Sequence, residues 1–122
     1  DLVRNLCVDV ECDFMRVKSY VGKKKQGDIQ IMKDLETAVK GKHVYLVDDI
    51  LDSGNTMNAV IEYLEVKHPA SINIVTLLTR ETSPKPSVPF ATAFTIKDEW
   101  LIGYGMDDDK GFARNYDGVF AL

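Results

Sequence analysis

The stretch VYLVDDILDSGNT, residues 44–56, carries the strongest structural signal in the chain. Four apolar residues lead into an acidic pair, Asp48 and Asp49, and the chain then passes through small polar residues into a helical pattern. A short apolar run that ends in turn residues favours a strand buried in a parallel sheet. The stretch therefore predicts a strand, a turn and a helix, in that order.

The turn in this stretch has the chemistry of a phosphate-binding loop. Ligands of open parallel sheets bind beyond the carboxyl ends of the strands, where residues 48–56 are expected to lie. A turn that enters a helix presents backbone N–H groups and the positive end of the helix dipole. Ser53 and Thr56 add hydroxyl donors, and Gly54 allows the backbone to approach a ligand closely. The three carboxylates would repel a bare anion, so we expect them to serve hydroxyl groups, a metal ion or a proton.

The composition limits the class of protein. A chain of 122 residues with 28% charged and 45% hydrophobic residues predicts one ordinary globular domain. The net charge of −4 gives no indication of a nucleic-acid partner. No apolar run is long enough to span a membrane, and there is no signal-peptide pattern. Cys7 and Cys12 lack metal-ligand spacing, and we expect both to be reduced, as in a cytoplasmic protein.

The residues before the signature predict a helix end and a two-stranded arm. Residues 1–6 have apolar side chains at helical spacing, and residues 10–18 alternate as in a half-buried strand. A polar, lysine-rich and glycine-containing loop follows, and residues 29–32 form a second short β pattern. We expect this arm to carry a mobile loop.

The residues after the signature predict a helix and further strands. Apolar residues recur at i, i+3, i+4 and i+7, the stripe of a helix packed on a sheet. These residues are Met57, Val60, Ile61 and Leu64. Residues 72–78 and 90–96 are predicted strands, with a proline-rich loop at residues 83–89 between them. The whole pattern indicates an α/β fold with a mostly parallel sheet.

The two histidines are interpreted as surface residues. His68 lies where the predicted helix ends before Pro69, and His43 lies at the start of the central strand. Neither position is at the carboxyl edge, so neither histidine is a candidate catalyst.

Residues 44–56 resemble the phosphoribosyl pyrophosphate signature of the type I phosphoribosyltransferases. The likeness includes the apolar lead-in, the acidic pair, two aliphatic residues, a third aspartate and the Ser-Gly-Asn-Thr turn. Two more stretches resemble the hypoxanthine-guanine subgroup: FMRVKSY (14–20) its lid arm, and IKDEWLIGYGMD (96–107) its purine-binding strand. The resemblance implies a type I phosphoribosyltransferase-like α/β fold, a mostly parallel sheet flanked by helices with a flexible two-stranded lid arm.

The resemblance also implies an activity. Members of this subgroup transfer the 5-phosphoribosyl group from phosphoribosyl pyrophosphate to N9 of hypoxanthine or guanine, giving IMP or GMP and pyrophosphate. The chain would then be a Mg²⁺-dependent pentosyl (glycosyl) transferase of purine salvage. A homodimer or homotetramer is expected by the same resemblance.

The resemblance assigns the acidic residues to the reaction centre. Asp48 and Asp49 would hold the ribose hydroxyls and the water shell of one Mg²⁺, and Asp107 would bind a second. Asp52 would lie near purine N7 and act as general base or proton relay. The developing positive charge on the ribose makes electrostatic stabilisation the main requirement.

The remaining site residues are assigned to substrate binding. Ser53, Gly54, Asn55 and Thr56 would clamp the 5′-phosphate.

For the base, Trp100 would stack on the purine, although a lone Trp also serves in core packing, and the backbone at Leu101 would contact the base edge. Ser19 and Tyr20 would lie on a lid that excludes water from the activated ribose.

Two positions depart from the family pattern. Arg80 stands where the family has a Lys that donates to the purine 6-oxo group, so the preference among hypoxanthine, guanine and xanthine stays open. Ala113 stands where the family has a pyrophosphate-contacting Arg, and Arg114 follows it.

The start of the chain also departs from the family. It opens without Met on DLVRNL, which predicts a helix already under way. We therefore expect residues 1–122 to form a single phosphoribosyltransferase domain that lacks its N-terminal strand and pyrophosphate loop.

Three alternatives stay open at this point. The first is a xanthine-preferring transferase on the same scaffold. The second is a regulatory, RNA-binding protein that keeps the fold without catalysis, which the acidic charge balance and the retained Asp52 disfavour. The third is a folded but inactive domain that cannot hold pyrophosphate.

Overall fold

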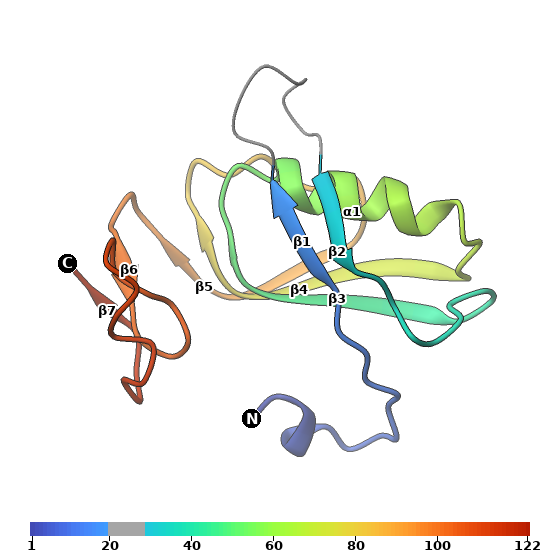
Figure 1. Ribbon diagram of the computed structural model, residues 1–122, viewed down its shortest axis with the longest axis horizontal. Helices are drawn as coiled ribbons and strands as arrows, with labels where there is room; N and C mark the ends of the chain where they lie inside the picture. Colours follow the sequence, from blue (N-terminus) through green and yellow to red (C-terminus); the bar gives the residue numbers. More distant parts are fainter. Residues whose placement is uncertain (20–28) are drawn as a thin grey trace.

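A three-stranded parallel sheet forms the centre of the protein, for which a computed structural model describes residues 1–19 and 29–122 (Figure 1). The strands β3 (His43–Leu51), β4 (Ser71–Arg80) and β5 (Phe90–Ile96) lie in the order β3-β4-β5, and both pairings are parallel. Helix α1 (Asn55–Glu65) connects β3 to β4. The predicted strand, turn and helix are therefore confirmed, and the fold is α/β with a parallel central sheet.

The core lies between α1 and the sheet. The four stripe residues predicted from the sequence are all buried, and Leu64 is fully buried. They pack with Leu51 of β3 and with Ile72 and Ile74 of β4. Burial of aliphatic side chains at this density is the main stabilising term in a domain of this size.

The predicted two-stranded arm is present. Strands β1 (Arg16–Ser19) and β2 (Ile29–Lys33) pair antiparallel, and Figure 1 shows them beside α1. Met15, Val17 and Ile29 are partly buried against the core below α1. Residues 20–28, where the mobile loop with Tyr20 was expected, and the side chain of Ser19 lie outside what the structure describes.

Two aspartates accept the hydrogen bonds that hold the base of this arm in place. Asp13 accepts hydrogen bonds from the backbone N–H groups of Glu36 (2.7 Å) and Thr37 (2.8 Å). Asp34, directly after β2, accepts from the Tyr63 hydroxyl (2.5 Å) and from Lys67 Nζ (2.9 Å), at and beyond the end of α1. The Tyr63 hydroxyl and the Lys67 ammonium hold the pKa of the Asp34 carboxyl down at about 2. The arm is thereby tied to the helix.

The C-terminal residues form a small antiparallel unit beside the sheet. Strands β6 (Leu101–Ile102) and β7 (Phe120–Ala121) pair, and the Leu122 N–H donates to the Trp100 carbonyl (2.9 Å). The rings of Tyr116 and Phe120 meet edge to face at 5.9 Å. Figure 1 shows this unit beyond the carboxyl ends of β4 and β5.

Two expectations for the N-terminal residues are wrong. Residues 1–6 contain one 3₁₀ turn, Val3–Asn5, and Leu2, Val3 and Leu6 are all exposed. Of the predicted strand at residues 10–18, only the part that begins at Arg16 is a β-strand in the structure. The alternation before Arg16 does not bury one face, since the Phe14 side chain is 75% exposed. Without a partner strand or a core to cover it, an apolar pattern does not by itself form a regular element.

The remaining expectations for regular structure are confirmed. Residues 83–89 form a loop, and β5 has the predicted bounds. Cys7 and Cys12 are free, although Cys12 lies in an irregular segment. In the described part of the chain, no helix is long and apolar enough to cross a membrane.

Asp34→Asn tests the tie between the arm and the helix. Because the folded pKa lies below the usual value of 3.8, this stabilisation is present above about pH 4 and is lost as the pH falls through about 2. Since both partners are partly exposed, we expect the variant to lose at most about 1 kcal/mol of unfolding free energy at neutral pH. Urea unfolding should show this difference narrowing between about pH 4 and about pH 2.

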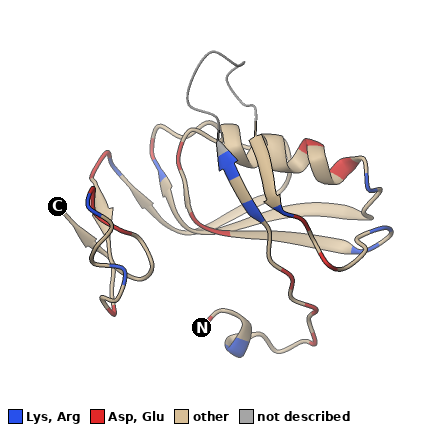
Figure 2. Cartoon of the chain, in the orientation of Figure 1, with Lys and Arg blue, Asp and Glu red and all other residues tan. Residues whose placement is uncertain are grey.

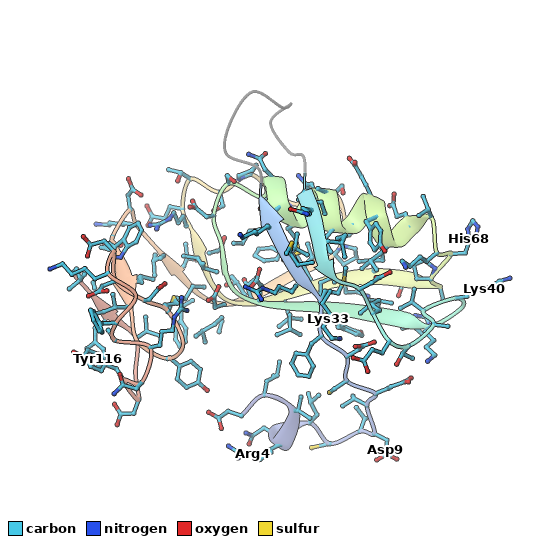
Figure 3. The ribbon with its side chains drawn as sticks, viewed as in Figure 1. Arg4, Asp9, Lys33, Lys40, His68 and Tyr116 are labelled. Carbon is cyan, nitrogen blue, oxygen red and sulfur yellow. The ribbon has the colours of Figure 1, made fainter. Side chains whose placement is uncertain are left out.

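Asp9→Asn is the matched control, because Asp9 is exposed and lies outside this cluster (Figure 3). Equal losses in the two variants, or a difference that does not depend on pH, would contradict the role given to Asp34.

Candidate active site at the carboxyl edge of the sheet

The acidic pair lies inside β3 and not beyond its end. The strand runs four residues further than the apolar run that ends at Val47, through Asp48 and Asp49 to Leu51. Its parallel pairing continues past the acids, with Asp48 opposite Thr76 and Leu51 opposite Thr79. Because successive side chains of a strand point to opposite faces, Asp48 and Asp49 present their carboxylates to different faces of the sheet. Figure 2 shows acidic residues along this end of β3 and the turn after it.

The surroundings of Asp48 disfavour its charge. Part of the residue is accessible to solvent, yet desolvation raises the pKa of its carboxyl, and the neighbouring Asp49 carboxylate raises it further. The Asp49 N–H donates to Asp48 Oδ1 at 3.0 Å, which partly opposes this shift. A cation bound here would offset the negative charge of the acidic pair, and a hydroxyl group would donate hydrogen bonds to it.

The turn after β3 has the geometry that its sequence predicted. Gly54 has φ +73°, the left-handed region that glycine adopts without strain, and α1 begins at the next residue. The Asn58 N–H donates to the Gly54 carbonyl (2.8 Å) as the first turn of the helix forms. The Asn55 N–H at the start of the helix lies 3.5 Å from the Ser53 hydroxyl oxygen, and the positive end of the helix dipole lies at this turn. This arrangement suits a phosphate group.

The end of β3 is fixed by β4 and the loop after it. The Leu51 carbonyl accepts from the Ser83 hydroxyl at 2.7 Å and from the Thr79 hydroxyl at 3.4 Å. A Cβ placed on Gly54 would lie 3.5 Å from Pro84 Cγ, so the same loop supports the turn from outside. Sequence reasoning missed Ser83 and Thr79. Their only signal was that hydroxyl residues follow the last apolar residues of β4, at the ligand edge.

Arg80 joins two segments of the edge. Its Nε lies 3.2 Å from Asp52 Oδ1, across the gap between β4 and the turn after β3. Its Nη1 donates to the carbonyls of Glu99 (2.9 Å) and Lys97 (3.1 Å) and lies 3.4 Å from Asp98 Oδ1. The side chain is only 13% exposed. The structure thus brings two predicted site residues, Arg80 and Asp52, into direct contact.

The predicted base-binding residues follow this network in the chain. Trp100 comes directly after the turn that Arg80 holds, and its side chain is 58% exposed. Leu101 begins β6 and is partly buried. An exposed indole at a ligand edge is compatible with stacking and is not the buried core residue that was the alternative.

Asp107 is paired with Arg114. Arg114 Nη2 lies 2.5 Å from Asp107 Oδ2, and its Nη1 donates to the Gly105 carbonyl. Ala113, at the position of the family Arg, is buried with φ +70°. Arg114, the next residue, is the arginine that contacts the acidic segment. The displaced arginine therefore contacts one of the predicted metal ligands.

The residues present fit magnesium as the metal. The candidate ligands Asp48, Asp49 and Asp107 offer oxygen atoms only, which Mg²⁺ prefers. Among the residues that the structure describes, no group of three metal-binding side chains gathers at one point. Mg²⁺ commonly binds through one or two carboxylates together with substrate phosphate oxygens and water. The donor set therefore suits a metal that arrives with its substrate.

The histidines lie away from the edge, as expected. His68, with φ +57°, follows α1 at the end opposite to Tyr116 and the C-terminal unit (Figure 3). His43 Nδ1 is within 2.8 Å of the Ser71 hydroxyl at the start of the paired strands.

Comparisons with known proteins agree on one family. Residues 1–109 match the phosphoribosyl transferase domain family. The hypoxanthine phosphoribosyltransferase of Escherichia coli (strain K12) is 42% identical over 118 residues, covering 95% of this chain and 64% of that protein. Among solved structures, the hypoxanthine phosphoribosyltransferase of Staphylococcus aureus superposes with a TM-score of 0.87 at 32% identity, over 99% of this chain and 66% of that one.

A third similar structure contains a ligand. The hypoxanthine phosphoribosyltransferase of Trypanosoma cruzi, in complex with the product IMP, has a TM-score of 0.85 at 29% identity, over 99% of this chain and 65% of that one. The chain thus spans less than two thirds of the length of these relatives.

Gly54→Ala tests the phosphate-binding turn, with Gly41→Ala as a matched control. The two glycines have nearly equal φ, +73° and +72°, so each alanine should cost about 1–2 kcal/mol of stability in urea unfolding. Only Gly54 lies at the candidate site. We expect Gly54→Ala alone to weaken binding of a 5′-phosphate ligand such as IMP in calorimetry. Equal affinities for the two variants would contradict the assignment of this turn.

Proposed function

The chain belongs to the phosphoribosyl transferase domain family, and on that premise we propose that it is a hypoxanthine (guanine) phosphoribosyltransferase of purine salvage. In this reaction the bond from ribose C1′ to pyrophosphate breaks and a bond from purine N9 to C1′ forms. The purine loses a proton, and the products are IMP or GMP and pyrophosphate. The relatives named above carry this activity in their names.

One observation supports the proposal: the turn at Gly54, the Asp52–Arg80 pair and Trp100 follow the carboxyl ends of three adjacent strands. The turn at Gly54 and the start of α1 suit a 5′-phosphate. The Asp52–Arg80 pair and the exposed Trp100 lie where a purine base would extend from it. The groups proposed for the phosphate and for the base thus follow adjacent strands of the sheet.

Each acidic residue has a separate task in this proposal. Asp48 and Asp49 bind the ribose hydroxyls and help hold the positive charge that develops on the sugar. Asp52 accepts the purine proton near N7 as general base or relay. Mg²⁺, bound through waters to the acidic pair and by Asp107, would neutralise the departing pyrophosphate.

The other residues bind and orient the substrates. Ser53, Gly54, Asn55 and Thr56 hold the phosphate, and the carbonyl of Leu51 is fixed behind them.

At the base, Arg80 donates toward the purine 6-oxo group, Trp100 stacks on the ring, and the backbone at Leu101 contacts its edge. Ser19 and Tyr20 belong to the lid that excludes water. The family resemblance further supports a homodimer or homotetramer and a cytoplasmic location.

The reaction is tested by following pyrophosphate release from phosphoribosyl pyrophosphate and Mg²⁺ with four bases in parallel: hypoxanthine, guanine, xanthine and adenine. We expect the 6-oxopurines to react and adenine not to. Asp52→Asn should lower turnover about 10²–10⁴-fold, the usual contribution of a general base. Transfer to none of the bases, or unchanged turnover in Asp52→Asn, would refute the proposal.

Stacking is tested by the fluorescence of Trp100, the one Trp in the sequence. IMP should quench its emission, and Trp100→Ala should weaken IMP binding by about 0.5–1.5 kcal/mol beyond the loss of contact area, whereas Trp100→Phe should restore most of it. Phe112→Ala is the control, because Phe112 is also an exposed aromatic residue near the C-terminus. Unquenched emission at saturating IMP would show that the indole does not face the base.

A further inference from the structure

Arg80 differs from the other arginines of the chain in its surroundings. Arg4, Arg16 and Arg114 are exposed, whereas the Arg80 side chain is almost enclosed at the end of β4. Its partners come from two segments that are not neighbours in the sequence: Asp52 in the turn after β3, and residues 97–99 after β5. A charged group with so little exposure is stable only when it is fully engaged by such partners.

The shape of the guanidinium allows Arg80 to bind Asp52 and residues 97–99 at the same time. Nε faces the Asp52 carboxylate, while Nη1 faces two backbone carbonyls, so the fork spans both segments at once. A lysine ammonium, the group that the resembling family has here, presents one nitrogen and cannot fix two directions in the same way. The Arg80 guanidinium can therefore connect the two segments through separate nitrogen atoms, which a lysine ammonium does not have.

Residues 97–99 make few other hydrogen bonds to the described part of the chain. The backbone hydrogen bonds of this region among the described residues end at Ile96, whose carbonyl accepts from the Glu81 N–H, and resume at Trp100, whose carbonyl accepts from Leu122. The Asp98 side chain is 95% exposed and lies 3.4 Å from Nη1. Arg80 is thus the group that orders the turn between β5 and Trp100.

We propose that Arg80 is a positioning residue that couples Asp52 to the turn at 97–99, so that the proton-accepting carboxylate and the stacking indole of Trp100 keep a fixed separation. This inference rests on the proposed function and deepens it, because it names the residue that would position the proton acceptor relative to the base-stacking ring. It gives Arg80 a role before any base is bound, in addition to donation toward the 6-oxo group.

The coupling is tested without substrate, through Trp100 fluorescence in the 122-residue chain. Acrylamide quenching and anisotropy are measured for the wild type, Asp52→Asn, Arg80→Gln and the double variant. Among the described residues, the Asp52 side chain makes its ion pair with Arg80 and no hydrogen bond or ion pair with residues 97–100, so we expect it to affect Trp100 through Arg80. We expect Asp52→Asn to increase quenching in the wild-type background and to have no further effect in the Arg80→Gln background.

Two more variants make the test independent of simple destabilisation. Arg80→Lys keeps the charge and should still show increased quenching, because an ammonium lacks the separate Nε and Nη1 donors that reach the two segments. Lys42→Gln removes another ion pair, with Glu11 far from the edge, and should leave Trp100 unchanged. If Arg80→Gln fails to fold, the comparison of Arg80→Lys with Asp52→Asn carries the same test.

The result that would overturn the inference is an Asp52→Asn variant with unchanged Trp100 quenching, or additive effects of the two substitutions. Where turnover is measurable, Arg80→Lys should raise KM for the purine more than it lowers kcat. The fluorescence test needs no turnover, so a failure of the proposed function would not conceal the answer.

Discussion

The packing of α1 on the parallel sheet is the constraint on which the rest of the structure depends. Leu64 of the helix is fully buried, and Ile74 of β4 is almost so. Removing a buried leucine typically costs about 2–5 kcal/mol, a large part of the stability of a small domain. Because the helix must lie along the sheet, the chain has only residues 52–54 in which to reverse direction, and the sharp turn at Gly54 is the consequence.

The candidate site follows from that turn. The start of α1 and the ends of β3 and β4 are brought to one edge by packing, and the Leu51 carbonyl and Arg80 then hold them in register. Burial raises the pKa of the Asp48 carboxyl, and the neighbouring Asp49 carboxylate adds to this shift. A site of this kind is completed by cationic or hydroxylated ligands, which is what a ribosyl transfer from a pyrophosphate would bring.

The sequence was sufficient for the elements that have strong local patterns. The signature predicted β3, the turn and α1 because apolar periodicity, Gly54 and the buried stripe all favour the same structure. It was insufficient for residues 1–14, where the apolar pattern finds no partner and stays exposed. It also placed the acidic pair beyond the strand, because aspartate is unfavourable in β structure unless function or pairing with β4 retains it.

Long-range contacts of the site were beyond sequence reasoning for a physical reason. The Arg80–Asp52 pair and the Ser83 bond to Leu51 join residues about thirty positions apart, and no local spacing encodes such contacts. Arg114 and Asp107 are closer in sequence, but their contact crosses an irregular segment that has no repeating pattern from which to predict it.

The most direct measurement is chemical-shift mapping of the isotope-labelled chain during titration with IMP and Mg²⁺. The central claim is that one edge of the sheet binds both the phosphate and the base of a purine nucleotide. It predicts saturable shifts at the backbone of residues 53–56 and, in the same titration, at Arg80 and Trp100. Shifts confined to one of these two sets, or shifts at the opposite end of the sheet near His43, would contradict it.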